Sequence, residues 1–460
     1  MNLTQFGNTD AILVSDSHLI QSFAHLDSLK QNSARTAIVS AEGAYVRDSQ
    51  GNQLLDGIGG LWCVNVGHGR TEIINAIHEQ LNKLDYYSTF YGFTHPPAAA
   101  LAEKLAQLAP GDLNRVYFSN SGSVANDTAI RILHHYNNLL GRPGKKKILS
   151  RVNAYHGSTH LAIAMTTPKF SVGWDSARDL VHHLKCPHHY WERDNVTESE
   201  FLDILAEDMV REVERIGAEN IACFIAEPIM GAGGVIVPPA GYHARMRDIT
   251  RAYDIKYISD EVVTSFGRLG EMFASKDVFG IEPDIITTAK GLTSGYQPLA
   301  ATIVSDEIYD VISGPDAMFF HGMTYSGHPA AAAAGLANIA LIENDSLLEQ
   351  VRRTGPLFET TLKTLEALDG VGEVRGSHFM MAVQLVADKE TKVLLPEALN
   401  VAKRVADEAA RRGLIIRPSG DFFILSPTLI MDDGQIETIG EILEESINVA
   451  VSSLRNEMGA

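Results

Sequence analysis

The stretch IKYISDEVVTSFGRLGEMFASKDVFGIEPDIITTAKGL, residues 255–292, contains the two short apolar runs on which our assignment of the fold depends. Asp260 ends the first run, and Lys290 follows the second. Runs of this kind, rich in β-branched residues and separated by loops with Gly and Pro, predict two buried parallel strands joined by a helical crossover. Ligands of such sheets collect at the carboxyl ends of the strands, so both side chains are expected in one crevice.

Helical and strand-like segments alternate on both sides of this stretch. From about residue 98 to residue 305, helical patterns are separated by short apolar runs that predict strands at 115–119, 147–150, 221–226, 257–260, 284–288 and 299–304. Alternation of this kind is typical of an α/β fold with a mostly parallel sheet covered by helices. We therefore expect a large α/β domain over residues 66–340.

The character of the sequence changes after about residue 346. Long helical segments and two strand-like runs predict a smaller α+β domain over residues 341–460, with helices near 346–367, 396–412 and 434–455 and strands at 380–386 and 422–426. Residues 37–55 alternate and turn at Ser-Gln-Gly-Asn, the pattern of an antiparallel hairpin. We expect residues 1–65, an arm followed by this hairpin, to join the small domain and make it discontinuous.

The composition limits the kinds of partner. The 460 residues include 57 acidic and 38 basic side chains, and the net charge of −19 argues against nucleic acid and anionic membranes. No run of about 18 apolar residues is present to span a bilayer; the Ala-rich run at 329–342 is interrupted by Gly and Asn and predicts a closely packed helix. Three widely spaced cysteines and an amino end without a secretory pattern favour a reducing, cytoplasmic location.

Polar residues follow three other predicted strands. Small residues precede a helix at Ser121-Gly122-Ser123, where open backbone amides favour an anion, although Ser and Gly there are often simple capping residues. Tyr155 and His156 follow the strand at 147–150, and an aromatic there either stacks on a flat ligand or belongs to the core. Glu227 ends another strand and, taken alone, is expected to be a solvated loop acid.

The pair Asp260 and Lys290 matches the needs of one cofactor. Most lysines at strand ends face solvent, but a buried lysine loses its proton readily and forms Schiff bases with aldehydes. Pyridoxal phosphate needs such an amine at one end and a carboxylate that stabilises the ring cation at the other. Val262, two residues beyond Asp260 in extended chain, is placed to touch the face of the ring.

A histidine-rich run, VHHLKCPHHY at 181–190, suggests a different chemistry. Four histidines and a cysteine within a few residues could bind a transition metal. Adjacent histidines point apart, however, and no HExxH or CxxC order fixes a coordination geometry. We therefore interpret the run as a surface or interface loop and expect no metal.

Motifs in a fixed order extend the pattern over nearly the whole chain. They are LWCVNVG at 61–67, SNSGS at 119–123, NAYHGST at 153–159, AEPIMGAGGVIVPP at 226–239, SDEVVTSFGR at 259–268, TTAKGLTSGY at 287–296, HGMTYSGHP at 321–329 and IIRPSGD at 415–421. By these motifs the chain resembles the class III, fold-type I pyridoxal-phosphate aminotransferases, and among them the ω-amino acid or amine:pyruvate transaminases. The resemblance implies pyridoxal 5′-phosphate as the cofactor.

The resemblance also implies a role for each matching residue. Lys290 would form the Schiff base with the cofactor, and Asp260 would contact its pyridine nitrogen. The other cofactor contacts would come from Ser121, Gly122, Ser123, Tyr155, His156, Glu227, Val262 and Thr324. Because Thr324 matches a threonine that reaches the phosphate from the other subunit, a homodimer is implied, and a tetramer is left open.

The substrate contacts are implied in the same way. Arg417 resembles the mobile arginine that binds an acceptor carboxylate and moves away for an amine that has none, and Glu227 matches the acid that partners such an arginine in several relatives. The aromatic lining of the pocket would come from Trp62, Phe23 and Phe90 together with the cofactor-stacking tyrosine. A pocket of this kind would admit both pyruvate and amines.

Two positions depart from the family pattern. Val124 stands where the family usually has an acid, and Met230 stands where relatives often have Gln; both bear on substrate detail rather than on reaction class. We expect a ping-pong transamination of an ω-amino acid or primary amine with pyruvate, giving a carbonyl product and alanine. The alternatives are a decarboxylase or aminomutase on the same fold, or a catalytically idle metal- or partner-binding protein. The amine donor is not identified by the sequence.

Overall fold

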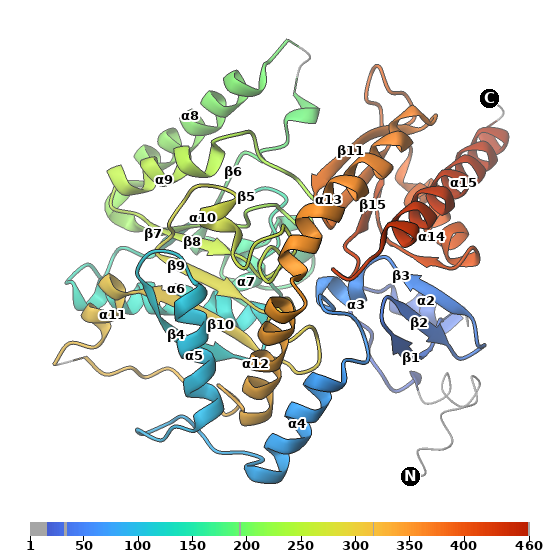
Figure 1. Ribbon diagram of the computed structural model, residues 1–460. Helices are drawn as coiled ribbons and strands as arrows, with labels where there is room; N and C mark the ends of the chain where they lie inside the picture. Colours follow the sequence, from blue (N-terminus) through green and yellow to red (C-terminus); the bar gives the residue numbers. More distant parts are fainter. Residues whose placement is uncertain (1–15, 32–34, 193–194, 316, 459–460) are drawn as a thin grey trace.

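A seven-stranded sheet forms the centre of the larger part of the molecule. The computed structural model describes residues 16–31, 35–192, 195–315 and 317–458 (Figure 1). The strand order is β4-β10-β9-β8-β7-β5-β6. In chain order the strands are β4 (Leu113–Ser119), β5 (Lys147–Arg151), β6 (Val181–Leu184), β7 (Ile221–Ala226), β8 (Lys256–Asp260), β9 (Ile285–Thr288) and β10 (Ala300–Ser305).

The strand directions confirm the predicted, mostly parallel α/β fold. Strands β6, β5, β7, β8 and β9 are parallel neighbours, and β10 alone runs antiparallel to β9 and β4. Six strands therefore bring their carboxyl ends to one edge of the sheet, namely β4, β5, β6, β7, β8 and β9. The six strands expected from the sequence are present within a few residues of their predicted bounds.

Two predictions for this part of the chain were wrong. The histidine-rich run does not form a loop throughout, because residues 181–184 form the edge strand β6, parallel to β5. The segment between β8 and β9 is not a helical crossover, since its one α-helix, α10, covers only Ala274–Asp277. Turns and bends occupy residues 262–272, where Gly267 and Gly270 adopt φ of 92° and 81° and so prevent a continuous helix.

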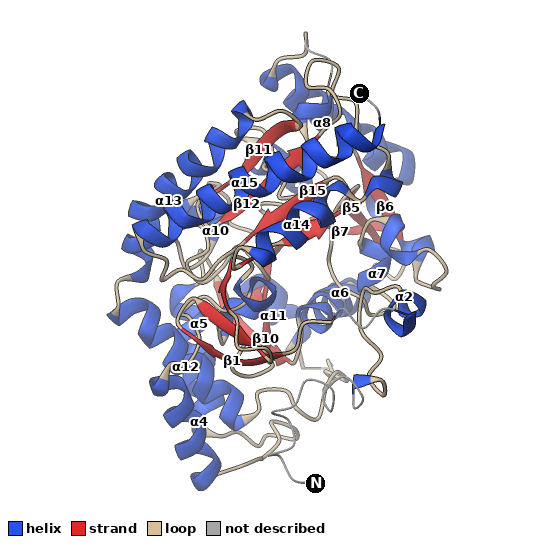
Figure 2. Ribbon diagram, turned by 90° about the vertical axis from the view of Figure 1, so that its right-hand side faces the viewer, coloured by secondary structure: helices blue, strands red, loops and turns tan. Residues whose placement is uncertain are grey.

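Helices cover both faces of the sheet (Figure 2). Alternate strand residues point to opposite faces, so Ile285 packs with α6 while its neighbour Ile286 packs with α5 and α12. The helices of this part are α4 (Thr71–Lys83), α5 (Pro96–Leu108), α6 (Gly122–Leu139), α7 (Ala162–Met165), α8 (Glu198–Ile216), α9 (Tyr242–Ala252), α11 (Asp306–Ile312) and α12 (Pro329–Asn344).

The Ala-rich segment forms α12, as predicted. It packs closely against α4 and α5, and a Cβ added at Gly335 would lie 3.0 Å from the Leu101 side chain. Small residues therefore permit the close approach of these helices. None of the helices among the described residues is long and apolar enough to cross a membrane.

A second, four-stranded sheet occupies the C-terminal part of the chain, in the order β11-β12-β15-β14. Its strands are β11 (Val371–Ser377), β12 (Met380–Leu385), β14 (Arg417–Ser419) and β15 (Phe422–Leu425). Three helices accompany it: α13 (Leu347–Lys363), α14 (Val401–Arg411) and α15 (Asp433–Met458). Their apolar faces form one core cluster with the sheet, so this part has its own hydrophobic core.

The predicted N-terminal hairpin is present and is joined to the C-terminal part. β1 (Ile38–Glu42), β2 (Tyr45–Asp48) and β3 (Gln53–Asp56) pair in antiparallel fashion, and β3 pairs in parallel with β13 (Leu414–Ile415). Figure 1 shows the hairpin in blue beside the red C-terminal helices. Two short helices, α2 (Leu26–Gln31) and α3 (Gly59–Trp62), flank it in the sequence. The domain boundaries at residues 65 and 340 stay a prediction.

A buried arginine ties three distant segments together. Arg268 is completely buried; it donates from Nη2 to Asn65 Oδ1 at 2.9 Å and from Nη1 to the carbonyl oxygens of Phe379, at 3.1 Å, and Pro427. Burial lowers the pKa of Arg268 to about 10, so the guanidinium keeps its charge at neutral pH. The turn segment after β8 is thereby fixed to both the N-terminal and the C-terminal parts of the chain.

We predict that Arg268→Met destabilises the protein by about 3 kcal/mol, because it leaves buried acceptors without donors. The measurement is urea-induced unfolding. The matched control is Arg352→Met, which breaks an exposed ion pair with Glu271 and should cost less than about 1 kcal/mol. Equal effects of the two substitutions would contradict the role given to Arg268.

Candidate active site

A cavity of about 380 Å³ lies at the carboxyl edge of the large sheet. It is lined by side chains from the sheet, from the N-terminal segment and from the C-terminal part: Ser22, Phe23, Leu61, Trp62, Gly122, Ser123, Asn126, Tyr155, His156, Gly157, Glu227, Ile229, Ala232, Asp260, Val262, Val263, Ala289, Lys290 and Arg417. The cavity thus contains most of the residues singled out in the sequence. Ser121, Phe90 and Thr324 are outside this lining.

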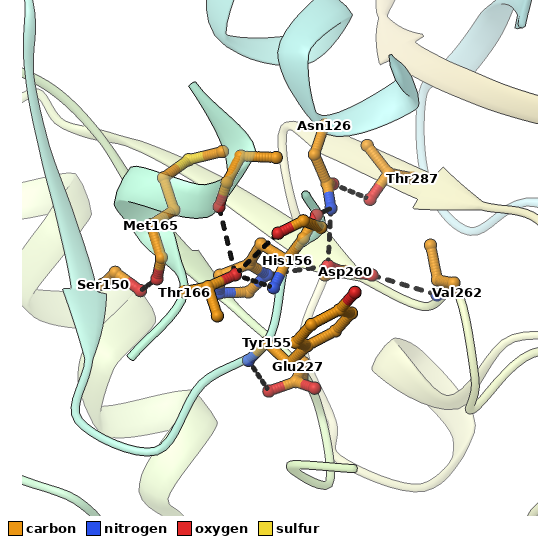
Figure 3. Close-up of polar contacts among 12 residues, drawn as sticks. Asn126, Ser150, Tyr155, His156, Met165, Thr166, Glu227, Asp260, Val262 and Thr287 are labelled. Atoms are coloured by element: carbon orange, nitrogen blue, oxygen red, sulfur yellow. Dashed lines mark hydrogen bonds and ion pairs between the residues drawn. The ribbon is translucent and has the colours of Figure 1, made fainter. Parts of the chain in front are cut away.

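Asp260, the last residue of β8, is held by three hydrogen bonds (Figure 3). Its Oδ2 lies 2.7 Å from His156 Nδ1 and accepts from Asn126 Nδ2 at 2.8 Å, and its Oδ1 accepts from the Val262 amide at 3.1 Å. The carboxylate is 4% exposed, and this set of donors compensates its burial. His156 Nε2 is also buried and has no hydrogen-bond partner among the described residues.

Lys290 follows β9, the strand next to β8, and begins the short 3₁₀ helix Lys290–Leu292 with φ of 35°. This value lies in the left-handed region, where a residue other than Gly is strained. Burial lowers the pKa of Lys290 to about 8, while attraction to Asp260 acts in the opposite direction. A much larger fraction of neutral amine is therefore present near neutral pH than for an ordinary lysine.

Ser121 and Ser123 at the start of α6 have different roles. Ser121 is the N-cap residue, whose Oγ accepts from the Val124 amide at 3.3 Å, so the capping interpretation is correct for this residue. Ser123 and Gly122 line the cavity at the N-terminus of this 18-residue helix, where the helix dipole favours an anion. A Cβ on Gly122 would lie 3.0 Å from the Val262 side chain, so a larger residue there would fit only if Val262 shifted.

Tyr155 and Glu227 form part of the cavity wall. Tyr155 is half-buried and makes edge contacts with Phe23 and Phe170, at centroid distances of 6.1 and 5.9 Å. Glu227 is 6% exposed and accepts from the Gly231 and Tyr155 amides at 3.1 and 3.4 Å, and burial raises its pKa. The expectation of a solvated loop acid at Glu227 was wrong, because the loop that follows β7 folds back over its carboxylate.

Trp62 and Arg417 come from outside the large sheet and close the other side of the cavity. The Arg417 Cζ atom and the Lys290 Nζ atom each lie 5.9 Å from the centroid of the Trp62 ring. Burial lowers the pKa of Arg417. The described residues show neither a hydrogen bond nor an ion pair between Arg417 and Glu227, since the Glu227 oxygens are bonded to backbone amides.

Phe90 and Thr324 lie together, away from the cavity of their own chain. The Phe90 ring packs on Gly322, where an added Cβ would lie 2.4 Å from it, and the Tyr86 hydroxyl donates to the Thr324 carbonyl at 2.8 Å. Several large side chains near Phe90, in residues 87–93, and near Thr324, in residues 318–325, are exposed: Tyr87, Tyr91, Phe93, Met318, Phe320 and Tyr325. The chain alone does not bring Phe90 and Thr324 to Lys290.

Asn126 is a residue of the site that no sequence motif had indicated. It lies on α6, lines the cavity and bonds directly to Asp260. The available signal was its spacing, because Asn126 comes four residues after Gly122 and therefore faces the same side of the predicted helix. A polar residue at this spacing from an anion-binding turn is a candidate for the same site.

The histidine-rich run lies outside the cavity lining, and its rings have protein partners. His182 Nδ1 lies 3.2 Å from Glu212, His188 Nε2 lies 2.9 Å from Glu373, and His189 Nε2 lies 2.7 Å from the Val196 carbonyl. No group of three or more metal-binding side chains is found in the described part of the chain.

The cavity residues fit pyridoxal phosphate. A buried amine of lowered pKa follows one strand, a hydrogen-bonded carboxylate ends the adjacent strand, and a glycine–serine turn opens the N-terminus of a long helix at the same edge. With the mostly parallel sheet, these features define a fold-type I pyridoxal-phosphate enzyme.

Comparison with known proteins identifies the family. Residues 28–447 match the class-III aminotransferase model, and the chain belongs to this family, whose members use pyridoxal phosphate. It is 40% identical to putrescine–pyruvate aminotransferase of Pseudomonas aeruginosa, with 93% of each chain covered, and 37% identical to diaminobutyrate–2-oxoglutarate transaminase of Halomonas elongata, with 95% of this chain and 94% of the relative covered.

Solved structures agree with this assignment. An (S)-enantioselective ω-transaminase from Thermomicrobium roseum superposes with a TM-score of 0.93 at 38% identity, over 97% of this chain and 99% of that one. The ω-transaminase of Pseudomonas jessenii, in complex with PMP, superposes with a TM-score of 0.93 at 36% identity, over 96% and 98% of the two chains. The expected family and fold are thus confirmed.

We predict that the rate at which pyridoxal phosphate attaches to Lys290 in the cofactor-free protein rises with pH around a midpoint near 8. The neutral amine is the reactive form, and burial lowers its pKa to about 8 from the ordinary lysine value of 10.5. Stopped-flow absorbance at a series of pH values measures the midpoint. A rate still rising steeply above pH 10 would contradict the lowered pKa.

Proposed function

We propose that this protein transfers an amino group from an ω-amino acid or primary amine to pyruvate, giving an aldehyde or ketone and alanine by a ping-pong mechanism. One observation carries the proposal: the cavity that contains Lys290 and Asp260 also contains an arginine, Arg417, beside an aromatic wall. A guanidinium can bind the carboxylate of pyruvate, and aromatic and apolar walls accept the carbon chain of an amine.

Residues in the cavity lining and next to it would hold the cofactor. Ser121, Gly122 and Ser123 at the start of α6 would bind its phosphate, with Thr324 from a second subunit. Val262 and Tyr155 would contact the two faces of its ring. His156 supports this arrangement through its bond to the Asp260 carboxylate, and Glu227 would lie at the same wall.

The bound cofactor would supply an aldehyde carbon for the amine and a ring that withdraws electrons from the substrate carbon. Asp260 would hold a proton on the ring nitrogen, which its buried, hydrogen-bonded carboxylate is suited to do. Lys290 Nζ would bind the cofactor covalently at rest. Once released, it would take a proton from the substrate carbon and return a proton to the cofactor, acting as general base and then as general acid.

The substrate side of the cavity fits two kinds of molecule in turn. Trp62, Tyr155 and Phe23 would exclude water around the carbon chain of the donor, and Arg417 would bind the acceptor carboxylate. Among the described residues Arg417 lies over the Trp62 ring and makes no ion pair with Glu227, so it would not have to break such a pair to reach the acceptor. The relative from Pseudomonas aeruginosa is named for putrescine and pyruvate, which supports an amine donor and pyruvate here.

We predict that the purified protein forms alanine from pyruvate with at least one amine in a panel containing β-alanine, taurine, putrescine and an aromatic amine. Lys290→Ala should lower the rate roughly 1000-fold, because both the covalent link and the proton carrier are lost. Lys276→Ala, which removes an exposed lysine of the same segment, is the control. Release of carbon dioxide from a substrate without any alanine would favour a decarboxylase instead.

We infer a homodimer whose sites are shared between subunits, with a cytoplasmic location. The cavity of one chain lacks Phe90 and Thr324, and both residues adjoin exposed aromatic side chains that a second copy could cover. The three cysteines are free thiols, which supports a reducing compartment.

A mixing experiment tests the shared site. In a mixed dimer of Lys290→Ala and Thr324→Ala chains, one site would have both native residues and the other would have neither. We therefore predict that co-refolding the two variants restores about a quarter of the wild-type alanine formation, since half of the dimers are mixed and each has one intact site. Lys290→Ala mixed with Lys276→Ala is the control for the refolding yield, because half of its sites keep Lys290 whether or not the chains exchange. No gain over the separate variants would contradict a shared site.

A further inference from the structure

Asn126 is a buried amide at the centre of the hydrogen bonds around Asp260 (Figure 3). Its Nδ2 donates to Asp260 Oδ2 at 2.8 Å and to the His156 carbonyl oxygen at 2.7 Å. Both partners can only accept, so the nitrogen of the amide must face them. Its Oδ1 then faces β9, where it accepts from Thr287 Oγ1 at 2.7 Å. Every bonding atom of the amide is fixed.

The two carboxylate oxygens of Asp260 accept different numbers of hydrogen bonds. Oδ2 accepts from both Asn126 and His156, which fills its two lone pairs. Among the described residues, Oδ1 accepts only from the Val262 amide, which leaves it one lone pair. A carboxylate clamped in this way offers one defined oxygen to a further donor.

We propose that Asn126 is a positioning residue that holds the Asp260 carboxylate so that Oδ1 receives the ring nitrogen proton of pyridoxal phosphate. The inference rests on the proposed function. Asn126 acts through Asp260, while Thr287 acts one step further away by fixing the orientation of the Asn126 amide. Without the Asn126 donor, the carboxylate is free to turn and to share Oδ2 between its other partners.

A purely structural role for Asn126 is the alternative. Asn137 provides the comparison, because it is a second buried asparagine on α6, 1% exposed like Asn126, and its Nδ2 donates to the Leu133 carbonyl at 2.9 Å. It is absent from the cavity lining. Truncating either side chain removes a buried amide from the same helix, but only one of them contacts Asp260.

The experiment compares two probes that differ in one atom. Dissociation constants for the cofactor-free protein are measured by fluorescence for pyridoxal phosphate and for its 1-deaza analogue, in which a carbon replaces the ring nitrogen. For Asn126→Ala we expect about tenfold weaker binding of pyridoxal phosphate, the effect of one charge-assisted hydrogen bond. Binding of the deaza analogue should change less than about twofold, since it has no ring nitrogen to engage Oδ1.

Two further variants complete the test. Thr287→Val keeps the volume of the side chain and should weaken binding of pyridoxal phosphate, but not of the deaza analogue, by a smaller factor than Asn126→Ala. It tests the inference if Asn126→Ala fails to fold. Asn137→Ala should leave the ratio of the two dissociation constants at its wild-type value. Equal weakening of both probes by Asn126→Ala or Thr287→Val would overturn the inference. Failure of the wild-type protein to bind either probe would instead overturn the proposed function.

Discussion

Two ionisable groups buried at neighbouring strand ends impose the main constraint on this molecule. A carboxylate or an ammonium loses favourable hydration when it is buried, and the protein must replace it with hydrogen bonds or opposite charge. Asp260 receives three hydrogen bonds, whereas Lys290 is compensated chiefly by attraction to Asp260. As a result, Asp260 can accept a hydrogen bond from a ligand, whereas Lys290 stays close to its neutral, reactive form.

Much of the fold follows from local patterns that the sequence displays. The strands and helices of the large sheet, the hairpin and the Ala-rich helix have apolar periodicities or turn residues that identify them. The edge strand β6 was missed because two of its four residues are histidines, a composition that does not suggest a strand. The segment between β8 and β9 was misjudged because its length suggested a crossover helix, although its glycines and buried arginine favour a turn structure.

The sequence predicted those residues of the site that occur in a motif at the end of a strand. Motifs indicated Lys290, Asp260 and Arg417, but a motif does not reveal burial, and Glu227 was therefore misjudged when considered alone. Asn126 was missed because its importance depends on a contact with Asp260, 134 residues away in the sequence. Phe90 and Thr324 show a further limit, since the roles proposed for them depend on a second chain.

Helix α6 begins at the turn that would bind the phosphate, and one turn later it presents the amide that holds Asp260. Four residues of α-helix rise about 6 Å, so a rigid length of backbone separates the two contacts. The spacing between the contact for the anionic end of a ligand and the contact for its ring nitrogen is therefore set by the rigid helix and not by flexible loops. An insertion beyond the first turns would leave this spacing intact, whereas one between Gly122 and Asn126 would place both contacts out of register at once.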